Sequence, residues 1–246
     1  MKEALKVWPQ LSNYPGLTLK ATITSIICAG WKVYGEKETH CINAWDFSRW
    51  KKDINDDYTV CKEIYKVLKT ADAVVTHNGK RFDWKYLQTR LMFHKFDPLH
   101  KIHHIDTCSV AKQNLLSFNN RLGTLGQWLS DDKKLENGGW GLWVQVANKE
   151  KKALKLMEEY CIQDVDLLEK IFTRLKPLIT NIPNYNLWRT DEQRMDNTNL
   201  CPKCGSEDIS FNGWRTTQTL KYQRLKCNEC GGSSRANIQG LQPRSF

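Results

Sequence analysis

The feature that most constrains the fold of this chain is a pair of C-x-x-C segments near its C-terminal end. Cys201 and Cys204 form the first segment, and Cys227 and Cys230 form the second. Four thiolates at this doubled spacing are typical of a tetrahedral zinc site with four cysteine ligands. Disulfides or a redox pair are the alternatives, but disulfides are rare in reducing compartments and a redox pair would not be doubled. The pattern therefore predicts a zinc ribbon. Metal binding would supply its folding free energy, because the segment is too small to build its own core.

The segment between the two cysteine pairs predicts a β-hairpin with basic and aromatic residues. Residues 209–214 and 220–226 can pair as its two strands. Trp214, Lys221 and Arg224 are candidate nucleic-acid contacts, because cations bind phosphates and aromatic rings stack on bases. A purely structural ribbon, or a ribbon that docks onto a protein, is the open alternative.

The charge of the chain favours a polyanionic partner. Its 246 residues include 37 Lys and Arg against 27 Asp and Glu, which gives a net charge of +10. Neutralising phosphates would release condensed counterions, although a solvated basic surface without a partner is the alternative. A content of 40% hydrophobic and 26% charged residues is typical of a globular protein.

Membrane and secretion signals are missing from the sequence pattern. No run approaches the ~18 to 20 apolar residues of a membrane span, and the first residues do not follow the signal-peptide pattern. We therefore expect no membrane association and a cytoplasmic location. In such a compartment the scattered cysteines are expected to be reduced core residues: Cys28, Cys41, Cys61, Cys108 and Cys161.

Strand and helix patterns alternate over residues 1–180 and predict an α/β domain. A polar linker over 181–198 and the ribbon over 199–246 follow. Asp56 or Asp57 is expected to cap the first main helix, whose apolar residues recur from Val60 to Leu68. The expected strands cover residues 22–34, 39–45, 73–76 and 102–105, and further helices cover 82–94, 122–129 and 148–176.

Two aspartates in this domain are candidates for chemistry. Asp83 follows the expected strand 73–76, at the edge where α/β folds place their sites, although it could be a simple helix cap. Asp164 lies about 40° from the centre of the apolar stripe of the long helix, with Tyr160 one turn earlier. A carboxylate there is costly unless it is paired with a cation or binds a metal, so a buried ion pair is the alternative. Asp166 and Glu169 point off the stripe and are expected to be solvated.

These residues resemble the motifs of a known enzyme family. The segment His77-Asn78-Gly79-Lys80-Arg81-Phe82-Asp83 and the segment Tyr160 to Asp164 (Y-x-x-x-D) resemble the second and third motifs of the DEDDy-type 3′→5′ exonucleases, which have an RNase H-like fold. Ile105-Asp106-Thr107 and residues 122–129 also match in order. The resemblance covers about residues 17–235 and extends to phage and bacterial members that end in a zinc ribbon.

The resemblance implies a two-metal-ion exonuclease that cuts nucleic acid with Mg²⁺ or Mn²⁺. DNA is the expected partner ahead of RNA, and RNA is the open alternative. It implies that Asp164 is a direct metal ligand and that Asp83 supports the second ion. Tyr160 would orient the attacking water, and Asn78 would contact the terminal nucleotide. Asp106 is expected to order the site without binding metal.

The first motif of the family, D-x-E on the first strand, is missing. The chain begins Met1-Lys2-Glu3-Ala4 and has no aspartate before Asp46. Glu3 is a candidate for the surviving second acid, with an ordinary terminal residue as the alternative. A non-catalytic nucleic-acid-binding protein is therefore the second functional hypothesis, and a transcription or recombination accessory factor is a third.

The family's first strand is also absent from the expected strands, although this strand lies in the centre of an RNase H-like sheet. Its loss would leave two strands with unpaired backbone groups, each costing about 1 to 3 kcal/mol. We therefore expect either that the chain is an incomplete version of a longer gene product or that a second polypeptide supplies the strand.

Overall fold

The computed structural model describes residues 4–9, 25–130, 140–180, 182, 200–219 and 221–235, with only the backbone course for residues 4–9 and 140. The chain divides into two compact units, Met1–Thr173 and Arg174–Phe246, and each is described by itself. None of the helices in the described ranges combines the length and apolar character that a membrane span requires.

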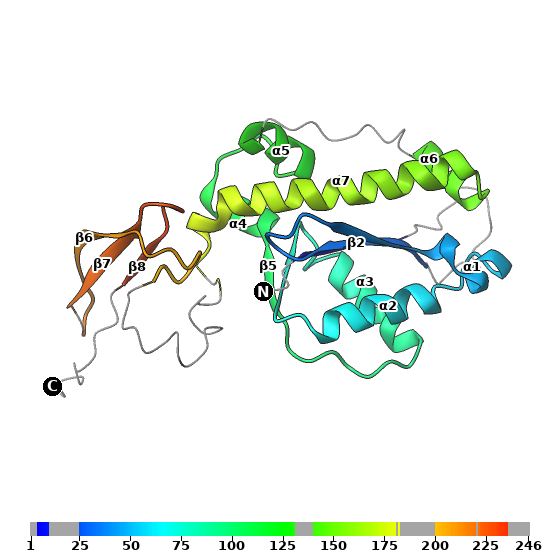
Figure 1. Ribbon diagram of the computed structural model, residues 1–246, viewed down its shortest axis with the longest axis horizontal. Coiled ribbons are helices and arrows are strands. Elements are labelled where there is room, and N and C mark those ends of the chain that lie inside the picture. The colour runs from blue at the N-terminus through cyan, green and yellow to red at the C-terminus, as the bar shows by residue number, and fades with distance from the viewer. Residues whose placement is uncertain are drawn as a thin grey trace. The chain divides into compact units, whose positions relative to one another are not determined.

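The first unit is built on a five-stranded mixed sheet (Figure 1). The strand order is β3-β2-β1-β4-β5. Strand β1 is antiparallel to β2 and parallel to β4, while β5 is parallel to β4. The carboxyl ends of β1, β4 and β5 therefore point the same way, as an α/β site requires. The strands are β1 (Ala4–Pro9), β2 (Ile26–Lys32), β3 (Thr39–Asn43), β4 (Ala73–Thr76) and β5 (His103–Asp106).

Strand β1 corrects the prediction that the first strand is absent. Residues Ala4–Pro9 occupy the centre of the sheet, between β2 and β4. Their pairing with β2 runs from Ala4 opposite Lys32 to Pro9 opposite Ile26 and shifts register at Trp8 and Pro9. Residues of this chain fill the central position, so β2 and β4 are not left with unpaired backbone groups on that side. The reason for expecting a strand from a second polypeptide is therefore removed.

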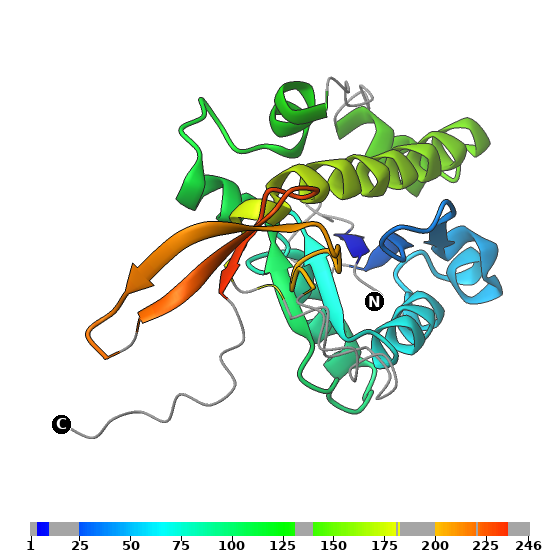
Figure 2. The ribbon, with the colours of Figure 1, turned by 60° about the vertical axis from the view of Figure 1, so that its left-hand side comes forward.

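Helices cover both faces of this sheet (Figures 1 and 2). The helices α2 and α3 lie on one face, and α6 and α7 lie on the other. This arrangement buries β2 and β4 on both sides, which explains their continuous apolar runs. The helices are α1 (Ser48–Lys52), α2 (Tyr58–Lys69), α3 (Asp83–Phe93), α4 (Thr107–Asn114), α5 (Leu122–Ser130), α6 (Trp140–Ala147) and α7 (Lys151–Leu175), with short 3-10 turns η1 (Ala44–Asp46) and η2 (Lys176–Leu178).

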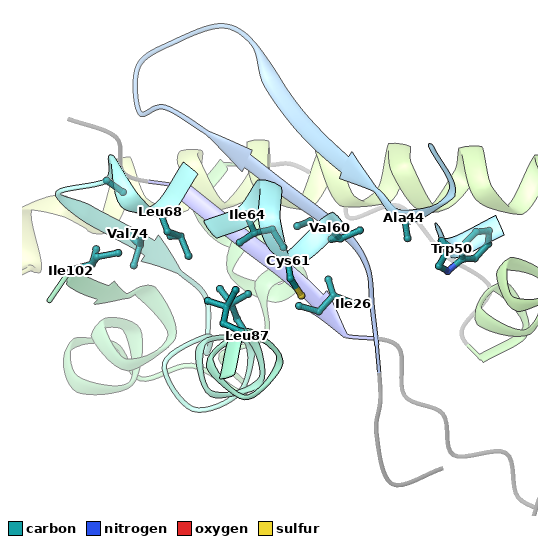
Figure 3. Close-up of a cluster of buried hydrophobic side chains, with 13 residues drawn as sticks. Ile26, Ala44, Trp50, Val60, Cys61, Ile64, Leu68, Val74, Leu87 and Ile102 are labelled. Carbon is teal, nitrogen blue, oxygen red and sulfur yellow. The ribbon is translucent and has the colours of Figure 1, made fainter. Parts of the chain in front are cut away.

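The core beneath the sheet confirms the expected periodicity of α2. Its buried residues Val60, Cys61, Ile64 and Leu68 belong to one apolar cluster with Ile26 of β2, Val74 of β4 and Leu87 of α3 (Figure 3). Residues spaced by three and four positions share one helix face, so the sequence pattern was sufficient to predict this contact surface.

The long helix α7 packs on β2 at a glycine. A Cβ atom added at Gly30 would lie 2.8 Å from Val165 Cγ2, 3.0 Å from Cys161 Sγ and 3.1 Å from the Cys161 carbonyl oxygen. Nothing larger than glycine fits without movement of the helix, since ordinary carbon contacts are about 3.5 to 4.0 Å. Gly30 therefore sets how closely α7 approaches the sheet.

Two acidic residues of α7 that were expected to be solvated pair with a cation, although the Asp166 side chain remains 41% exposed. Lys32 Nζ lies 2.7 Å from Glu169 Oε2 and 3.1 Å from Asp166 Oδ1. Lys32 is buried, and burial alone would lower its pKa, but its hydrogen bonds to Glu169 and Asp166 raise the pKa above the usual value. The expectation missed these ion pairs because a cation on β2 faces this side of the helix.

The second unit contains a three-stranded antiparallel sheet in the order β6-β7-β8. Its strands are β6 (Ile209–Thr216), β7 (Lys221–Cys227) and β8 (Ser233–Arg235). The hairpin predicted from the sequence is confirmed as β6–β7, whereas β8 was not predicted.

Candidate active site and cysteine cluster

The loop after β4 is held in place by Asp106 at the end of the neighbouring strand β5. The Asp106 carboxylate accepts hydrogen bonds from the backbone N–H groups of Asn78 (2.9 Å) and Lys80 (3.2 Å). It also accepts from Cys108 and Ser109 at the start of α4. A buried carboxylate that already accepts four N–H bonds orders the loop and has little capacity left for a metal ion. This agrees with the ordering role expected for Asp106.

Asn78 and Gly79 shape the same loop. Asn78 is exposed and has a φ of 61°, a left-handed conformation that asparagine tolerates better than most residues. A Cβ at Gly79 would lie 2.6 Å from Thr76 Cβ, so the loop folds back on β4 too closely for any other residue. The exposed Asn78 side chain therefore projects from the loop at a fixed position on the carboxyl edge of the sheet.

His77 has a positioning role that the sequence did not reveal. Its Nδ1 lies 2.9 Å from Thr107 Oγ1, and its Nε2 lies 2.8 Å from the Asn120 carbonyl oxygen. Thr107 Oγ1 in turn donates to the Thr76 carbonyl oxygen at 3.0 Å. His77 therefore joins β4 to the segments on both sides of α4. The sequence signals were its place directly after a buried strand and at the start of the motif segment His77 to Asp83.

The strand register brings Asp164 toward the same edge of the sheet as Asp83. Ala4 of β1 is paired with Val75 of β4, so two residues further along these parallel strands Lys6 is level with His77. Lys6 is also paired with Gly30, which lies under Cys161 and Val165 of α7. The turn of α7 that contains Asp164 therefore lies at the same height along the strands as His77, where the loop to Asp83 begins. Neighbouring strands in this part of the sheet are about 4.8 Å apart.

The two aspartates differ in burial. Asp164 is only 1% exposed, whereas Asp83 is half-buried as the first residue of α3. The helix dipole favours an acidic residue in the first turn of a helix. Asp83 therefore stabilises the start of α3 in addition to any chemical role.

Tyr160 lies one turn before Asp164 and is buried in the apolar cluster above the sheet. This cluster includes Ile27 of β2, Met157 of α7 and Leu142 of α6. The structure thus brings the predicted residues Tyr160 and Asp164 to the sheet-facing side of α7.

The central strand brings no carboxylate to this edge. Residues Ala4–Pro9 read ALKVWP, which contains no Asp or Glu. Glu3, the candidate for the missing first motif, lies outside the described residues. Asp83 and Asp164 are thus the two predicted acidic ligands whose places are described.

The four C-terminal cysteines meet as the spacing predicts. All four Sγ atoms lie within 4.8 Å of one another. The Cys201–Cys230 and Cys204–Cys227 Sγ pairs are each 3.6 Å apart. A tetrahedral zinc ion with Zn–S bonds of about 2.3 Å would place its sulfurs about 3.8 Å apart, whereas a disulfide needs about 2.0 Å. The cluster therefore has the dimensions of a metal site.

The local backbone stabilises one thiolate of this cluster, that of Cys227, whereas burial raises the pKa values of Cys204 and Cys230. Burial opposes ionisation of Cys227, but the backbone N–H groups of Cys230 and Glu229 help to lower its pKa to about 7. The Cys230 N–H lies 3.5 Å from the Cys227 Sγ. Gly205 and Gly231 follow the second cysteine of each pair and have φ angles of 80° and 69°, which only glycine adopts readily.

A second group of possible ligands, Asp57, Cys61 and His94, is an internal ion-pair cluster. Arg90 Nε donates to Asp57 Oδ2 at 2.8 Å, and Arg90 Nη2 donates to Oδ1. The backbone N–H of Ile26 donates to the same carboxylate at 2.8 Å. Because a guanidinium already neutralises Asp57, a cation at this place would face a like charge, so we assign the cluster to fold stability. Asp57 stands at the N-terminal boundary of α2, but its side chain does not cap the helix; Asp56 accepts from the Tyr58 N–H instead.

The three predicted nucleic-acid contacts of the hairpin do not share one face. Thr216 is paired with Lys221, and Trp214 is paired with Gln223, so Trp214 and Lys221 lie on the same face. Lys221 Nζ is 5.3 Å from the centre of the Trp214 ring. Arg224, one position from Gln223 along β7, lies on the opposite face because side chains alternate along a strand.

Comparison with known proteins identifies the first unit. The sequence matches the family described as the RNase H superfamily over residues 19–176, from before β2 to the end of α7. No curated protein matches the chain.

Proposed function

Because this chain belongs to the RNase H superfamily, we propose that it is a metal-dependent nuclease that removes nucleotides from 3′ ends of nucleic acid. The observation that carries the proposal is Asp164, a carboxylate buried on the sheet-facing side of α7 and level with the carboxyl edge of β4. A buried carboxylate at this edge of a nuclease fold is suited to binding a divalent cation, which supports the proposal.

Asp164 and Asp83 offer oxygen ligands that suit Mg²⁺ or Mn²⁺. Magnesium binds through one or two carboxylates together with substrate phosphates, so two aspartates are enough for one such ion. When bound, divalent ions in this kind of site activate a water molecule and stabilise the leaving oxygen. A centre with two ions would require further oxygen ligands besides these two residues.

The neighbouring residues have positioning roles in this proposal. Asp106 and His77 fix the loop from which Asn78 extends toward a 3′-terminal nucleotide. Lys80 and Arg81 are exposed on the same loop and can neutralise substrate phosphates. Tyr160 would orient the attacking water from the turn of α7 before Asp164.

A non-catalytic nucleic-acid-binding protein is the second candidate function. The absence of a carboxylate from β1 favours it, because the enzymes that the sequence resembles place their first two acids on this strand. Such a protein would retain the basic loop and the net charge of +10 without hydrolysis.

The deciding experiment compares Asp164→Asn and Asp83→Asn with the wild type on a single-stranded oligonucleotide labelled at its 5′ end. With Mg²⁺ or Mn²⁺ present, the wild type should shorten the labelled strand stepwise, and both variants should lose this activity. Glu159→Gln is the matched control, because Glu159 is exposed on the same helix and its removal also deletes one negative charge. Unchanged hydrolysis by Asp164→Asn rules out its role as a ligand.

Metal binding provides a second readout that does not depend on activity. Mg²⁺ or Mn²⁺ should raise the melting temperature of the wild type and of Glu159→Gln, but should have a smaller effect on Asp164→Asn. Binding of the metal without hydrolysis by the wild type would favour the non-catalytic candidate.

For the C-terminal unit, the proposed role of Cys201, Cys204, Cys227 and Cys230 is to hold one structural zinc ion. Metal analysis of the purified protein should find one zinc per chain, and Cys227→Ser should release it while the first unit stays folded. Thiols oxidised in pairs, without zinc, would contradict this assignment.

A further inference from the structure

The C-terminal sheet has one face on which cations gather around a tyrosine. Side chains alternate along a strand, so Tyr222, Arg224 and Lys226 of β7 share a face that excludes Leu225 and Cys227. The register adds Arg215 of β6, which is paired with Tyr222, and Arg235 of β8, which is paired with Arg224. We call this set the basic face: Arg215, Tyr222, Arg224, Lys226 and Arg235.

The charge of this face is not balanced within the described part of the unit. The strands β6, β7 and β8 contain no Asp or Glu. Among residues 200–219 and 221–235, no carboxylate forms an ion pair with the cations of the basic face. The acidic residues lie outside the strands, and the Asp208 carboxylate instead accepts from Asn228 Nδ2 at 2.7 Å.

The most informative feature of this face is the register, which places Arg224 directly opposite Arg235. Like charges placed directly opposite each other on neighbouring strands destabilise a sheet. No described carboxylate relieves this pair, so its cost is not recovered within the described unit. A polyanion laid across β7 and β8 would remove the repulsion.

Tyr222 adds an aromatic surface among these cations. It is half-buried and therefore held in place, and the Arg235 guanidinium lies 5.8 Å from the centre of its ring. Arg215 is its cross-strand partner on the other side. Along β7 the side chains at 222, 224 and 226 are spaced by about 6.6 Å, which is comparable with the separation of phosphates along an extended nucleic-acid strand.

We propose that the basic face binds single-stranded nucleic acid, with Arg215, Arg224, Lys226 and Arg235 at phosphates and Tyr222 stacked on a base. Cations that track a backbone beside an aromatic platform are the general means of binding single strands without sequence preference. The site lies on the C-terminal unit and involves neither Asp83 nor Asp164, so it holds whether or not the chain hydrolyses its ligand. The Trp214 and Lys221 face does not take part.

The test uses the full-length, zinc-loaded protein and a short fluorescein-labelled oligothymidylate, followed by anisotropy. Mg²⁺ and Mn²⁺ are omitted so that binding is measured without hydrolysis. Arg224→Gln/Lys226→Gln should weaken binding on the order of tenfold and reduce the slope of log K against log salt by about 1.4, since each single-strand phosphate contact contributes about 0.7. Zinc content equal to that of the wild type shows that each variant retains its fold.

Two matched controls make the result specific. Lys151→Gln/Lys152→Gln removes the same charge from an exposed part of α7 and should leave both quantities unchanged. Trp214→Ala/Lys221→Gln removes the ring and cation of the opposite face and should also bind like the wild type. Equal weakening by the charge-matched Lys151 pair would reduce the effect to net charge. Loss only in the Trp214 pair would move the site to the other face, and either result overturns the proposal.

Tyr222 separates nucleic acid from other acidic partners. Tyr222→Ala should weaken binding of the single strand roughly 5- to 100-fold while duplex DNA of the same length is bound as by the wild type, because stacking requires an unpaired base. Tyr222→Phe retains the ring and should retain the affinity. Tyr222→Ala with wild-type affinity for single strands, or an acidic peptide that competes equally well, would contradict a nucleic-acid site.

Discussion

Gly30 offers the sharpest test of how α7 is placed. Replacing it by alanine puts a methyl group 2.8 Å from Val165 Cγ2 and 3.1 Å from the Cys161 carbonyl oxygen. A separation of about 3.5 Å is the lower limit of ordinary contact, so the helix must retreat by roughly 0.5 Å or more. Overpacking of this kind lowers the free energy of unfolding by about 1 to 3 kcal/mol. Replacing glycine also reduces the conformational freedom of the unfolded chain, which raises the free energy of unfolding by about 0.4 to 1 kcal/mol.

The expected net effect of Gly30→Ala is a loss of about 1 to 2 kcal/mol in the free energy of unfolding. At about 2 to 4 °C per kcal/mol for a chain of this size, the melting temperature should fall by about 2 to 8 °C. Gly141→Ala is the control, because the Cβ position at Gly141 has nothing within 4 Å and alanine is the better helix former. This control should be neutral or slightly stabilising.

A double-mutant cycle with Val165→Ala identifies the cause. Val165→Ala removes the methyl groups that the new Cβ meets, so Gly30→Ala should cost less in that background, with a coupling of about 0.5 to 3 kcal/mol. The remaining contact with the Cys161 carbonyl oxygen prevents full rescue. If Gly30→Ala costs nothing, or costs the same in both backgrounds, then α7 does not approach β2 as described.

Three further changes test individual contacts. Asp57→Asn leaves the buried Arg90 without its anionic partner and should cost about 3 to 5 kcal/mol in urea denaturation; a loss below about 1 kcal/mol would show that the pair is not buried in solution. Burial lowers the pKa of His104 to about 4, below its usual value of about 6.5, so the stability that neutral His104 provides is complete above about pH 6.5. It should be lost progressively as the pH falls toward 4, by about 2 to 3 kcal/mol, and His104→Gln should remove that part of the pH dependence. Asp106→Ala removes the acceptor of four backbone N–H groups, so the Asn78 amide should exchange with solvent faster, and unchanged exchange would contradict its role in holding the loop.

The parts of the fold that the sequence predicts are those determined by local pattern. Strand β4 is bounded as expected, Ala73–Thr76, because four apolar or β-branched residues stand between polar neighbours. Helix α2 follows its apolar spacing from Val60 to Leu68. The cysteine cluster was also predictable, because the spacing of each pair and the glycines that follow it specify the local backbone.

The parts that the sequence did not predict depend on distant partners. Strand β1 reads ALKVWP, with a lysine and a terminal proline, and its identity as a strand comes from pairing with β2 and β4 on either side. Asp56 or Asp57 was expected to be a cap, but the Asp57 carboxylate instead binds Arg90, a residue 33 positions away. Asp166 and Glu169 were assigned to solvent because the cation that they bind, Lys32, lies on another element.

The division of the C-terminal sheet into two faces shows why even a correct hairpin prediction was not sufficient. Simple alternation from Phe211 would place Trp214 on the opposite face and Arg215 on the same face. The register is shifted between Phe211 and Trp214, so that Asn212 and Gly213 together oppose Arg224. This extra residue, with Gly213 at a φ of 76°, returns Trp214 to the side of Phe211, where their rings are 6.2 Å apart. The same bulge places Arg215 on the face of Tyr222. One extra residue in β6 thereby determines which cations share the face that we propose binds single-stranded nucleic acid.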